Sequence, residues 1–301
     1  MQGTSKQHSK EGSIEPEKKG NSSVAQRWLT AGIAMPVVLL FVWFGGWWAF
    51  VACLLVAILG MIELHTMLFK AGYRPLAWIS YGLMILFLFS AMFPAQHMLI
   101  LQVGIGASML VAFCWLLMRK QLEGTMVDWA LTLAVPVYLG WSMSYFLLLR
   151  GYETSTLHVM SGYWVTLPRG VWWLLATLLG VWGFDGAAFF SGRYFGRHKL
   201  APHISPAKTW EGVAGGLVFS VLACLLLTVI PLGVPWYLAI LLGLCIGISA
   251  TLGDLAESMI KRQMHVKDSG QIMPGHGGML DRIDSLLFAV FIVYVFSLFF
   301  H

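Results

Sequence analysis

Residues 236–260 read WYLAILLGLCIGISATLGDLAESMI, and this run decides the class of fold. It holds no charged residue before Asp254. About 20 mostly apolar residues in a helix are enough to cross the hydrocarbon core of a bilayer. The run therefore predicts a transmembrane helix with one carboxylate near its end.

The whole chain has the composition of a membrane protein. Of its 301 residues, 58% are hydrophobic and only 11% are charged, whereas soluble domains carry roughly a quarter charged residues. Hydropathy predicts an all-α, polytopic transmembrane helix bundle with about nine spans. We expect the spans near residues 29–46, 47–69, 76–93, 97–118, 128–149, 171–192, 213–230, 236–260 and 283–300.

Basic residues predict the orientation of this bundle. With nine spans, seventeen of the nineteen Lys and Arg residues fall on one side, and only Arg150 and Arg169 fall on the other. Basic residues concentrate in cytoplasmic loops. We therefore expect a cytosolic N-terminus in a multi-pass protein of the inner (plasma) membrane. The net charge of +5 fits topology and anionic lipid, and we expect no nucleic-acid partner.

Three regions follow from these patterns. Residues 1–26 are rich in Gly, Ser, Lys, Glu and Gln. This composition predicts a disordered cytosolic tail. Residues 27–150 hold the N-terminal transmembrane helices. Residues 151–301 are expected to form the C-terminal catalytic transmembrane region, because nearly all the clustered polar residues lie there.

The densest polar block spans residues 258–284, SMIKRQMHVKDSGQIMPGHGGMLDRID. Such a block is costly at the edge of an apolar protein, and its acids, bases and glycines indicate phosphates and metal ions. Just before it, Asp254 and Ser258 are four apart and share one helix face, which Lys261 continues. We therefore expect Asp254 to point into the bundle near the cytosolic surface.

Asp281 and Asp284 are three apart and share a face at the start of the last predicted helix. The helix dipole alone favours carboxylates at this position, and that is the alternative to a functional role. Three aspartates in one pocket, with Asp254, need a cation, and Mg²⁺ prefers carboxylate and phosphate oxygens. A second cation stays open. His276, between glycines, either donates to a phosphate or is a turn residue without a role.

A second polar segment runs from Asp185 to Glu211. Asp185 lies inside an apolar helix, where ionisable groups are functional by default, although a salt bridge to a neighbouring helix is the alternative. Residues 205–212 read as a loop entering a helix, with Ser205 and Thr209 as caps and Glu211 in the first turn. The same helix N-terminus, with Lys208, would also suit a phosphate.

These residues carry a family resemblance. The pattern S-x-I-K-R-x4-K-D-x-G-x3-P-x-H-G-G-x2-D-R-I-D over residues 258–284 resembles the signature of the phosphatidate cytidylyltransferase (CDP-diacylglycerol synthase) family. The resemblance extends to D-x2-A-F-x2-G-R-x-F-G from Asp185 and to S-P-x-K-T-W-E-G from Ser205. Ala207 stands where the family pattern is expected to have lysine. The first five spans match only as generic hydrophobic helices.

The resemblance implies transfer of CMP from CTP to phosphatidic acid in a membrane bilayer, with Mg²⁺ as cofactor and a homodimer as a candidate assembly. It implies that Asp254 and Asp281 bind the metal and that Asp284 supports them. The basic residues would contact phosphates, Ser205 and the Gly277–Gly278 backbone would cradle them, and Asp268 would orient Lys267 or contact the nucleotide. The predicted catalytic residues are Asp254, Lys261, Lys267, Asp268, Asp281 and Asp284. The predicted substrate-binding residues are Asp185, Ser205, Lys208, Glu211, Ser258, Arg262, His276, Gly277, Gly278 and Arg282.

Two other classes of function remain open at this point. A lipid transporter would also hold charges inside a bundle, but it is expected to show interrupted helices and paired motifs in two halves. A polyprenyl-phosphate sugar transferase or another lipid-phosphate nucleotidyltransferase would share metal aspartates and basic loops. The H-G-G-x2-D-R-I-D run argues against the sugar transferase.

Overall fold

The computed structural model describes residues 24–120, 122–151, 167–270 and 277–300, and helices make up most of them. The N-terminal half holds α1 (Val24–Phe44), α2 (Gly46–Lys70), α3 (Ala77–Ser90), η1 (Pro94–Gln96), α4 (His97–Leu117), α5 (Thr125–Pro136), η2 (Val137–Trp141) and α6 (Ser142–Gly151). The C-terminal half holds α7 (Arg169–Phe195), β1 (Lys199–Ala201), β2 (Ser205–Thr209), α8 (Trp210–Cys224), η3 (Leu225–Val229), α9 (Ile230–Leu232), α10 (Trp236–Gln263) and α11 (Leu280–Ser297).

Each predicted span coincides with one helix or one continuous run of helical segments. Six of these are long and apolar enough to cross a membrane, counted over the described residues: Gly46–Lys70, Pro94–Leu117, Thr125–Gly151, Arg169–Phe195, Trp210–Leu232 and Trp236–Gln263. The apolar stretches Ala34–Phe44 and Ala77–Ser90 are shorter. The all-α, multi-pass membrane fold is therefore confirmed, while nine crossings remain a prediction.

Two hydrophobic cores meet at α11. One core lies mainly among α7, α10 and α11, around the fully buried Trp173 and Leu242. The other lies among α2, α3, α6 and the first turns of α11, around Met61 and Met84. Leu287 of α11 belongs to the second core, and Val290 to the first. Because α11 is buried against both groups of helices, the position of its N-terminus depends on both.

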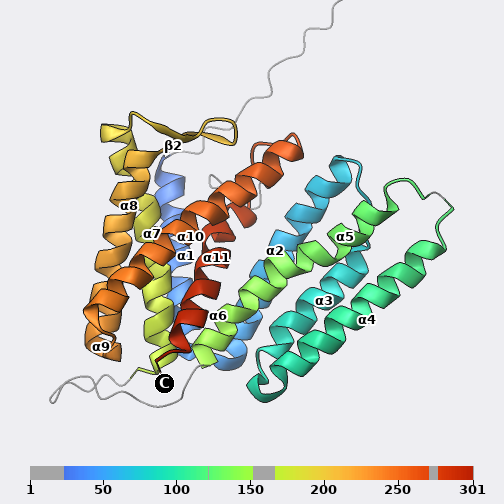
Figure 1. Cartoon of the computed structure of the whole chain (residues 1–301), viewed down its shortest axis with the longest axis horizontal. Coiled ribbons are helices and arrows are strands. Elements are labelled where there is room, and N and C mark those ends of the chain that lie inside the picture. The colour runs from blue at the N-terminus through green and yellow to red at the C-terminus, as the bar shows by residue number, and fades with distance from the viewer. Residues whose placement is uncertain (1–23, 121, 152–166, 271–276, 301) are drawn as a thin grey trace, which may run out of the picture.

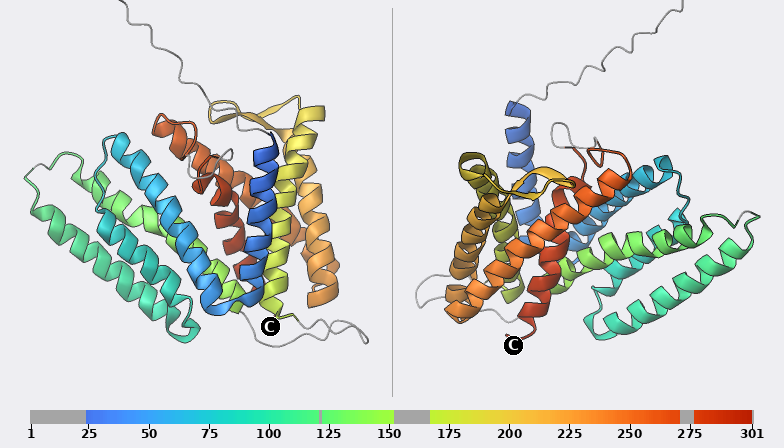
Figure 2. Two further views of the ribbon diagram at one scale, coloured as in Figure 1. Left: turned by 180° about the vertical axis from the view of Figure 1, so that it is seen from behind. Right: turned by 45° about the horizontal axis from the view of Figure 1, so that its top comes forward.

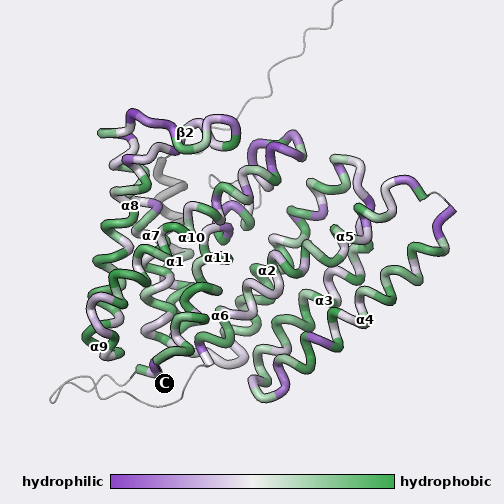
Figure 3. Tube along the Cα trace, in the orientation of Figure 1, coloured by the Kyte–Doolittle hydropathy of each residue, from purple (hydrophilic) through white to green (hydrophobic). Residues whose placement is uncertain are grey.

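The outer surface of the helices is apolar, and the polar residues gather at the helix ends (Figure 3). Large hydrophobic side chains such as Trp48, Leu110 and Leu226 are 65%, 67% and 60% exposed. Soluble monomers rarely expose extended apolar surfaces of this kind. The same surface is favourable against lipid, which agrees with the composition.

The polar connections lie together at one end of the bundle (Figures 1 and 2). The C-terminal ends of α2, α7 and α10 and the β1–β2 hairpin are at this end, and the α8–α10 turn is at the opposite end. This agrees with the alternation that the basic residues predict. The end that carries the hairpin is called the polar end below.

The segment before α8 differs from its prediction, because it forms a hairpin rather than a loop. Strands β1 and β2 are antiparallel, with Lys199 opposite Thr209 and Ala201 opposite Ser205. Thr209 caps α8 as expected, since its hydroxyl accepts a hydrogen bond of 3.2 Å from Gly212 N. Ser205 is not a cap, because the strand pairing holds it four residues before the cap position.

Candidate active site

The two polar segments of the sequence meet through one ion pair. Lys208 of β2 places its Nζ 2.7 Å from Oδ2 of Asp254 in α10. The Lys208 amine also donates to the Thr251 carbonyl over 3.4 Å, and Ser258 Oγ donates to Asp254 Oδ1 over 3.3 Å. The hairpin is therefore held over the C-terminal part of α10.

Asp254 also lies beside Asp284, because α10 and α11 cross closely at Gly253. A Cβ atom at Gly253 would lie 2.5 Å from the backbone oxygen of Asp284, so only glycine permits this approach. The carboxylates of Asp185, Asp254 and Asp284 are near enough to repel one another electrostatically, and Lys208 attracts Asp185. Helices α7, α10 and α11 thus contribute one acidic group each to the same region.

Asp185 and Asp284 differ in their surroundings. Asp284 is only 7% exposed, and its Oδ1 accepts a hydrogen bond of 2.6 Å from Ser285 N. Asp185 is an exposed residue of α7, and Arg282 attracts its carboxylate. The acidic region therefore extends from a buried side chain to an accessible one, with basic side chains along it.

Lys261 forms a second charged cluster with two carboxylates. Its Nζ lies 2.6 Å from Asp281 Oδ1 and 2.7 Å from Glu257 Oε2. Glu257 is 1% exposed, and its Oε1 has no hydrogen-bond partner within the described part of the chain. Lys261 therefore joins two largely buried carboxyl groups from adjacent helices.

Both oxygens of Asp281 are engaged by protein donors. Oδ1 accepts from Lys261, and Oδ2 accepts from Gly278 N over 2.8 Å and contacts Ser269 Oγ at 3.0 Å. Asp281 thus holds the start of α11 against the residues that follow α10. It remains the predicted metal ligand whose oxygens already have the most partners.

Other predicted residues lie around these clusters. Arg262 Nε donates to the Ile204 carbonyl in the hairpin turn over 3.3 Å. Glu211 lies in the first turn of α8 as expected, and its Oε1 is 2.6 Å from His198 Nδ1. Arg262 and Glu211 therefore help to hold the hairpin. His276 lies outside the described residues.

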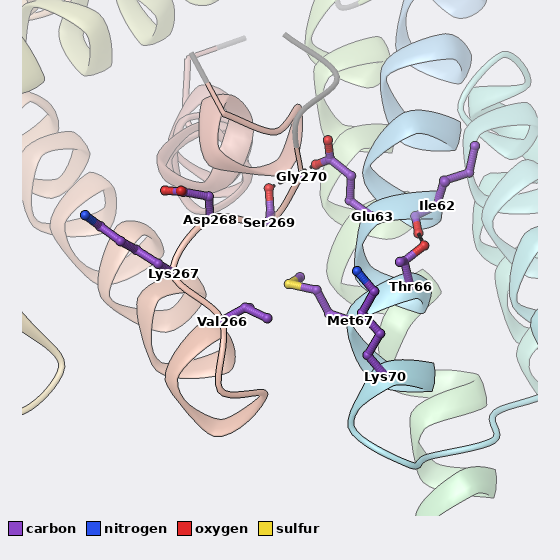
Figure 4. Close-up of a pocket in the computed structure, with 10 residues that line it drawn as sticks. All are labelled: Ile62, Glu63, Thr66, Met67, Lys70, Val266, Lys267, Asp268, Ser269 and Gly270. Carbon is purple, nitrogen blue, oxygen red and sulfur yellow. Dashed lines mark hydrogen bonds between the residues drawn. The ribbon is translucent and has the colours of Figure 1, made fainter. Parts of the chain in front are cut away.

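Lys267 and Asp268 belong to the connection between α10 and α11. With residues of α2 they line a hollow of about 550 Å³ (Figure 4). Lys70 of α2 lies on the opposite wall from Lys267. Gly277, with φ +81°, adopts a backbone conformation that favours glycine. The structure thus brings the described site residues to one end of the bundle.

No three His, Cys, Asp or Glu side chains among the described residues form a group that could hold a metal ion by themselves. Mg²⁺ is commonly held by one or two carboxylates together with substrate phosphates. Asp254 and Asp284, with their mutual repulsion, fit that shared mode of binding. The predicted magnesium site stays a prediction.

Two carboxylates of this region were not predicted from the sequence. Glu257 could have been found from its spacing of four residues to Lys261, which is typical of a helical ion pair. Glu63 of α2 is 3% exposed and contacts residues on both sides of the α10–α11 connection. A lone acid within a 25-residue apolar helix was the signal for Glu63, because such groups are rare in membranes.

The fold and this site together define a multi-pass helical membrane protein with paired acidic and basic groups at one end of its bundle. The chain belongs to the cytidylyltransferase family, whose family model matches residues 25–300. It is 34% identical to a phosphatidate cytidylyltransferase of Synechocystis over 298 residues, which cover 90% of this chain and 95% of that protein.

Two further relatives carry the same name. A phosphatidate cytidylyltransferase of Bacillus subtilis is 39% identical over 171 residues, 56% of this chain and 58% of that protein. One of Haemophilus influenzae is 45% identical over 129 residues, 40% of this chain and 44% of that protein. The family expected from the signature over residues 258–284 is therefore confirmed.

Proposed function

We propose that this protein is a phosphatidate cytidylyltransferase that converts CTP and phosphatidic acid into CDP-diacylglycerol and pyrophosphate, a step of membrane phospholipid synthesis. The Lys208–Asp254 pair carries the proposal, since it joins the two signature segments at one end of a membrane bundle. The names of the relatives supply the substrates.

The reaction needs charge compensation more than proton transfer. A phosphate oxygen of phosphatidic acid, already anionic at neutral pH, forms a bond to the α-phosphorus of CTP. The bond from that phosphorus to the β-phosphate oxygen breaks, and pyrophosphate leaves. Two polyanions must meet in line, so catalysis depends on positioning and on cations near the phosphates. Lys208, Lys267 and Arg282 are the side chains that we assign to this role.

Mg²⁺ would neutralise charge on the phosphates and align them for displacement. Asp254 and Asp284 would hold it, with phosphate oxygens as further ligands, and Lys208 would then exchange its contact with Asp254 for one with a phosphate. Lys261 holds the carboxyl groups of Asp281 and Glu257 in place through its two contacts. Asp185, the accessible carboxylate, would face the nucleotide or its metal.

The location of the site follows from the substrates. We propose that the polar end faces the cytosol, where CTP is available, and that the protein resides in the inner (plasma) membrane. Phosphatidic acid presents its headgroup at the same surface. A site at helix ends that is open toward lipid can receive both substrates. A homodimer stays a prediction.

The test is reconstitution in vesicles that contain phosphatidic acid, with CTP labelled in its cytidine and Mg²⁺ present. We expect a labelled lipid and pyrophosphate in a one-to-one ratio. Diacylglycerol in place of phosphatidic acid is the control, because it lacks the attacking phosphate. No labelled lipid from phosphatidic acid, or equal labelling with diacylglycerol, would refute the proposal.

A further inference from the structure

Glu63 is a buried carboxylate that the proposed reaction does not use. It comes from α2, more than two hundred residues before the residues of the signature segment that it contacts. Burial of a carboxylate without hydrogen-bond partners is costly. Glu63 is only 3% exposed, and both of its carboxylate oxygens have hydrogen-bond donors. Among the described residues, its carboxylate accepts hydrogen bonds from Ser269, Met279 and Leu280, which makes it a polar link from α2 to the α10–α11 connection.

One carboxylate holds both ends of this connection. On the entry side, Ser269 Oγ donates to Glu63 Oε2 over 3.0 Å. On the exit side, Met279 N donates to Oε1 and Leu280 N donates to Oε2, each over 2.9 Å. Met279 and Leu280 are the N-cap and the first residue of α11. Glu63 therefore supplies the cap that α11 lacks from its own N-cap side chain.

Ser269 passes this restraint on to the charged cluster. Its hydroxyl lies 3.0 Å from Glu63 Oε2 and 3.0 Å from Asp281 Oδ2, so one hydroxyl group contacts two carboxylates. Asp281 in turn contacts Lys261. The path from Glu63 through Ser269 and Asp281 to Lys261 consists of direct contacts of at most 3.0 Å.

The backbone around Glu63 is shaped to fit its side chain. A Cβ atom at Gly278 would lie 2.5 Å from Glu63 Oε2 and would also meet Ser269 Oγ. Figure 4 shows the Glu63 carboxylate directed at Ser269 and Gly270 across the hollow between α2 and the connection. No side chain larger than hydrogen fits there while the carboxylate keeps its hydrogen bonds.

We propose that Glu63 is a positioning residue for the proposed reaction. It fixes the two ends of the α10–α11 connection, and thereby sets the places of Asp281 and Lys261 relative to Asp254 and Asp284. The N-terminal helices thus take part in forming the site, although the signature lies wholly in the C-terminal half. This inference rests on the proposed function for its catalytic consequence, but not for its structural one.

The experiment compares Glu63→Gln with Asp128→Asn. Asp128 is a matched control, since it is a carboxylate of the N-terminal half that is 7% exposed. It accepts hydrogen bonds of 2.6 Å from Arg74 N and from Arg119 Nη1. Asp128 and these two partners are all far in sequence from the α10–α11 connection. Both substitutions are isosteric, remove one charge and leave donors unpaired, so both are expected to lower thermal stability.

Two readouts separate positioning from stability. Below the melting temperature of both variants, Glu63→Gln should lower kcat about tenfold or more, while Asp128→Asn stays within about twofold of wild type. By hydrogen exchange, the Met279 and Leu280 amides should lose protection in Glu63→Gln only. Adding Ser269→Ala to Glu63→Gln should lower kcat little further, since both act through one path.

Each outcome decides the proposal. Wild-type kcat in Glu63→Gln overturns the positioning role, even if exchange rises. Unchanged exchange at Met279 and Leu280 overturns the clamp itself. An equal fall of kcat in Asp128→Asn would mean that stability alone is responsible. If the wild-type protein made no CDP-lipid, the proposed function would fail, and the exchange arm would still decide whether Glu63 holds the connection.

Discussion

Lys208 of the β1–β2 hairpin lies 2.7 Å from Asp254 in the C-terminal part of α10. The pair is partly accessible, with side chains 20% and 37% exposed, so both groups can exchange partners when an anion or a cation arrives. A phosphate would attract Lys208, and a metal ion would attract Asp254. The pair is thus suited to a site that changes its charge state when substrate binds.

Substitution of either partner should remove activity with little loss of stability. Lys208→Met and Asp254→Asn should each lower kcat/KM for CTP on the order of a hundredfold or more, as loss of a charge-stabilising group typically does. Partly exposed ion pairs contribute about 1 kcal/mol or less to stability. Steady-state kinetics in vesicles and thermal unfolding in detergent measure the two effects.

The double variant distinguishes shared from separate roles. If Lys208 and Asp254 act on different charges of one complex, the double variant should lose more activity than either single variant. Near-wild-type kcat/KM in Asp254→Asn would contradict its role at the site. A large fall in unfolding temperature would instead make the pair structural.

Lys261 should behave in the opposite way and be required for folding stability. Lys261→Met removes the cationic partner of Asp281 and of Glu257, which is 1% exposed. Breaking a buried pair from one side costs roughly 3–5 kcal/mol, and we expect a value near the lower limit because Lys261 is 12% exposed. Chemical unfolding in detergent would measure this loss.

A second substitution, at Glu257, should restore part of that stability. Lys261→Met with Glu257→Gln should be more stable than Lys261→Met alone, because the amide supplies a hydrogen-bond donor beside Asp281, which has lost the donor of Lys261. Lys208→Met is the control with a more exposed partner. Equal destabilisation by Lys261→Met and Lys208→Met would contradict the difference in burial.

Hydropathy and charge were sufficient to predict where the helices lie and which ends share a side. The run at residues 236–260 became α10, and the basic connections came to the polar end. These features depend on local composition, which the sequence carries directly. The β1–β2 hairpin was missed because its few residues pair over one short turn and show no strand-like alternation.

Partners were harder to predict than positions. Asp281 and Asp284 do share a helix, but the donors around Asp281 come from Gly278 and Ser269, whose placement depends on the turn before α11. The sequence shows Glu63 as a lone acid in an apolar helix, and only the packing of α2 against α11 identifies its partners. Spacing predicts shared faces within one helix, whereas contacts between helices need the fold.

The crossing of α10 and α11 should not tolerate a side chain at Gly253. In Gly253→Ala the new Cβ would lie 2.5 Å from the Asp284 carbonyl oxygen, and a backbone atom cannot move aside alone. Overpacking of this kind typically costs about 1–3 kcal/mol. Separation of Asp254 from Asp284 should also lower kcat, which vesicle assays would measure at a temperature where the variant is folded.

Gly106→Ala in α4 is the matched control, because a Cβ atom there meets nothing within 4 Å. Alanine is about 1 kcal/mol more favourable than glycine within a helix, so this variant should be at least as stable as wild type and fully active. Full activity in Gly253→Ala would show that the closeness of Asp254 and Asp284 is not needed.

Metal removal should abolish activity without unfolding the protein. The described residues form no group of three ligating side chains that could hold a metal ion. We therefore expect the protein and the phosphates of the nucleotide to bind the metal together. EDTA should therefore stop CDP-lipid formation, and Mg²⁺ should restore it. Thermal unfolding separates joint binding from a metal site formed by the protein alone. Without CTP, Mg²⁺ should change the unfolding temperature little. With CTP, Mg²⁺ should raise that temperature in wild type, because a ligand that binds only the folded state stabilises it. Asp254→Asn should lose this increase. An increase of the same size with Mg²⁺ alone would instead indicate a metal site formed by the protein itself.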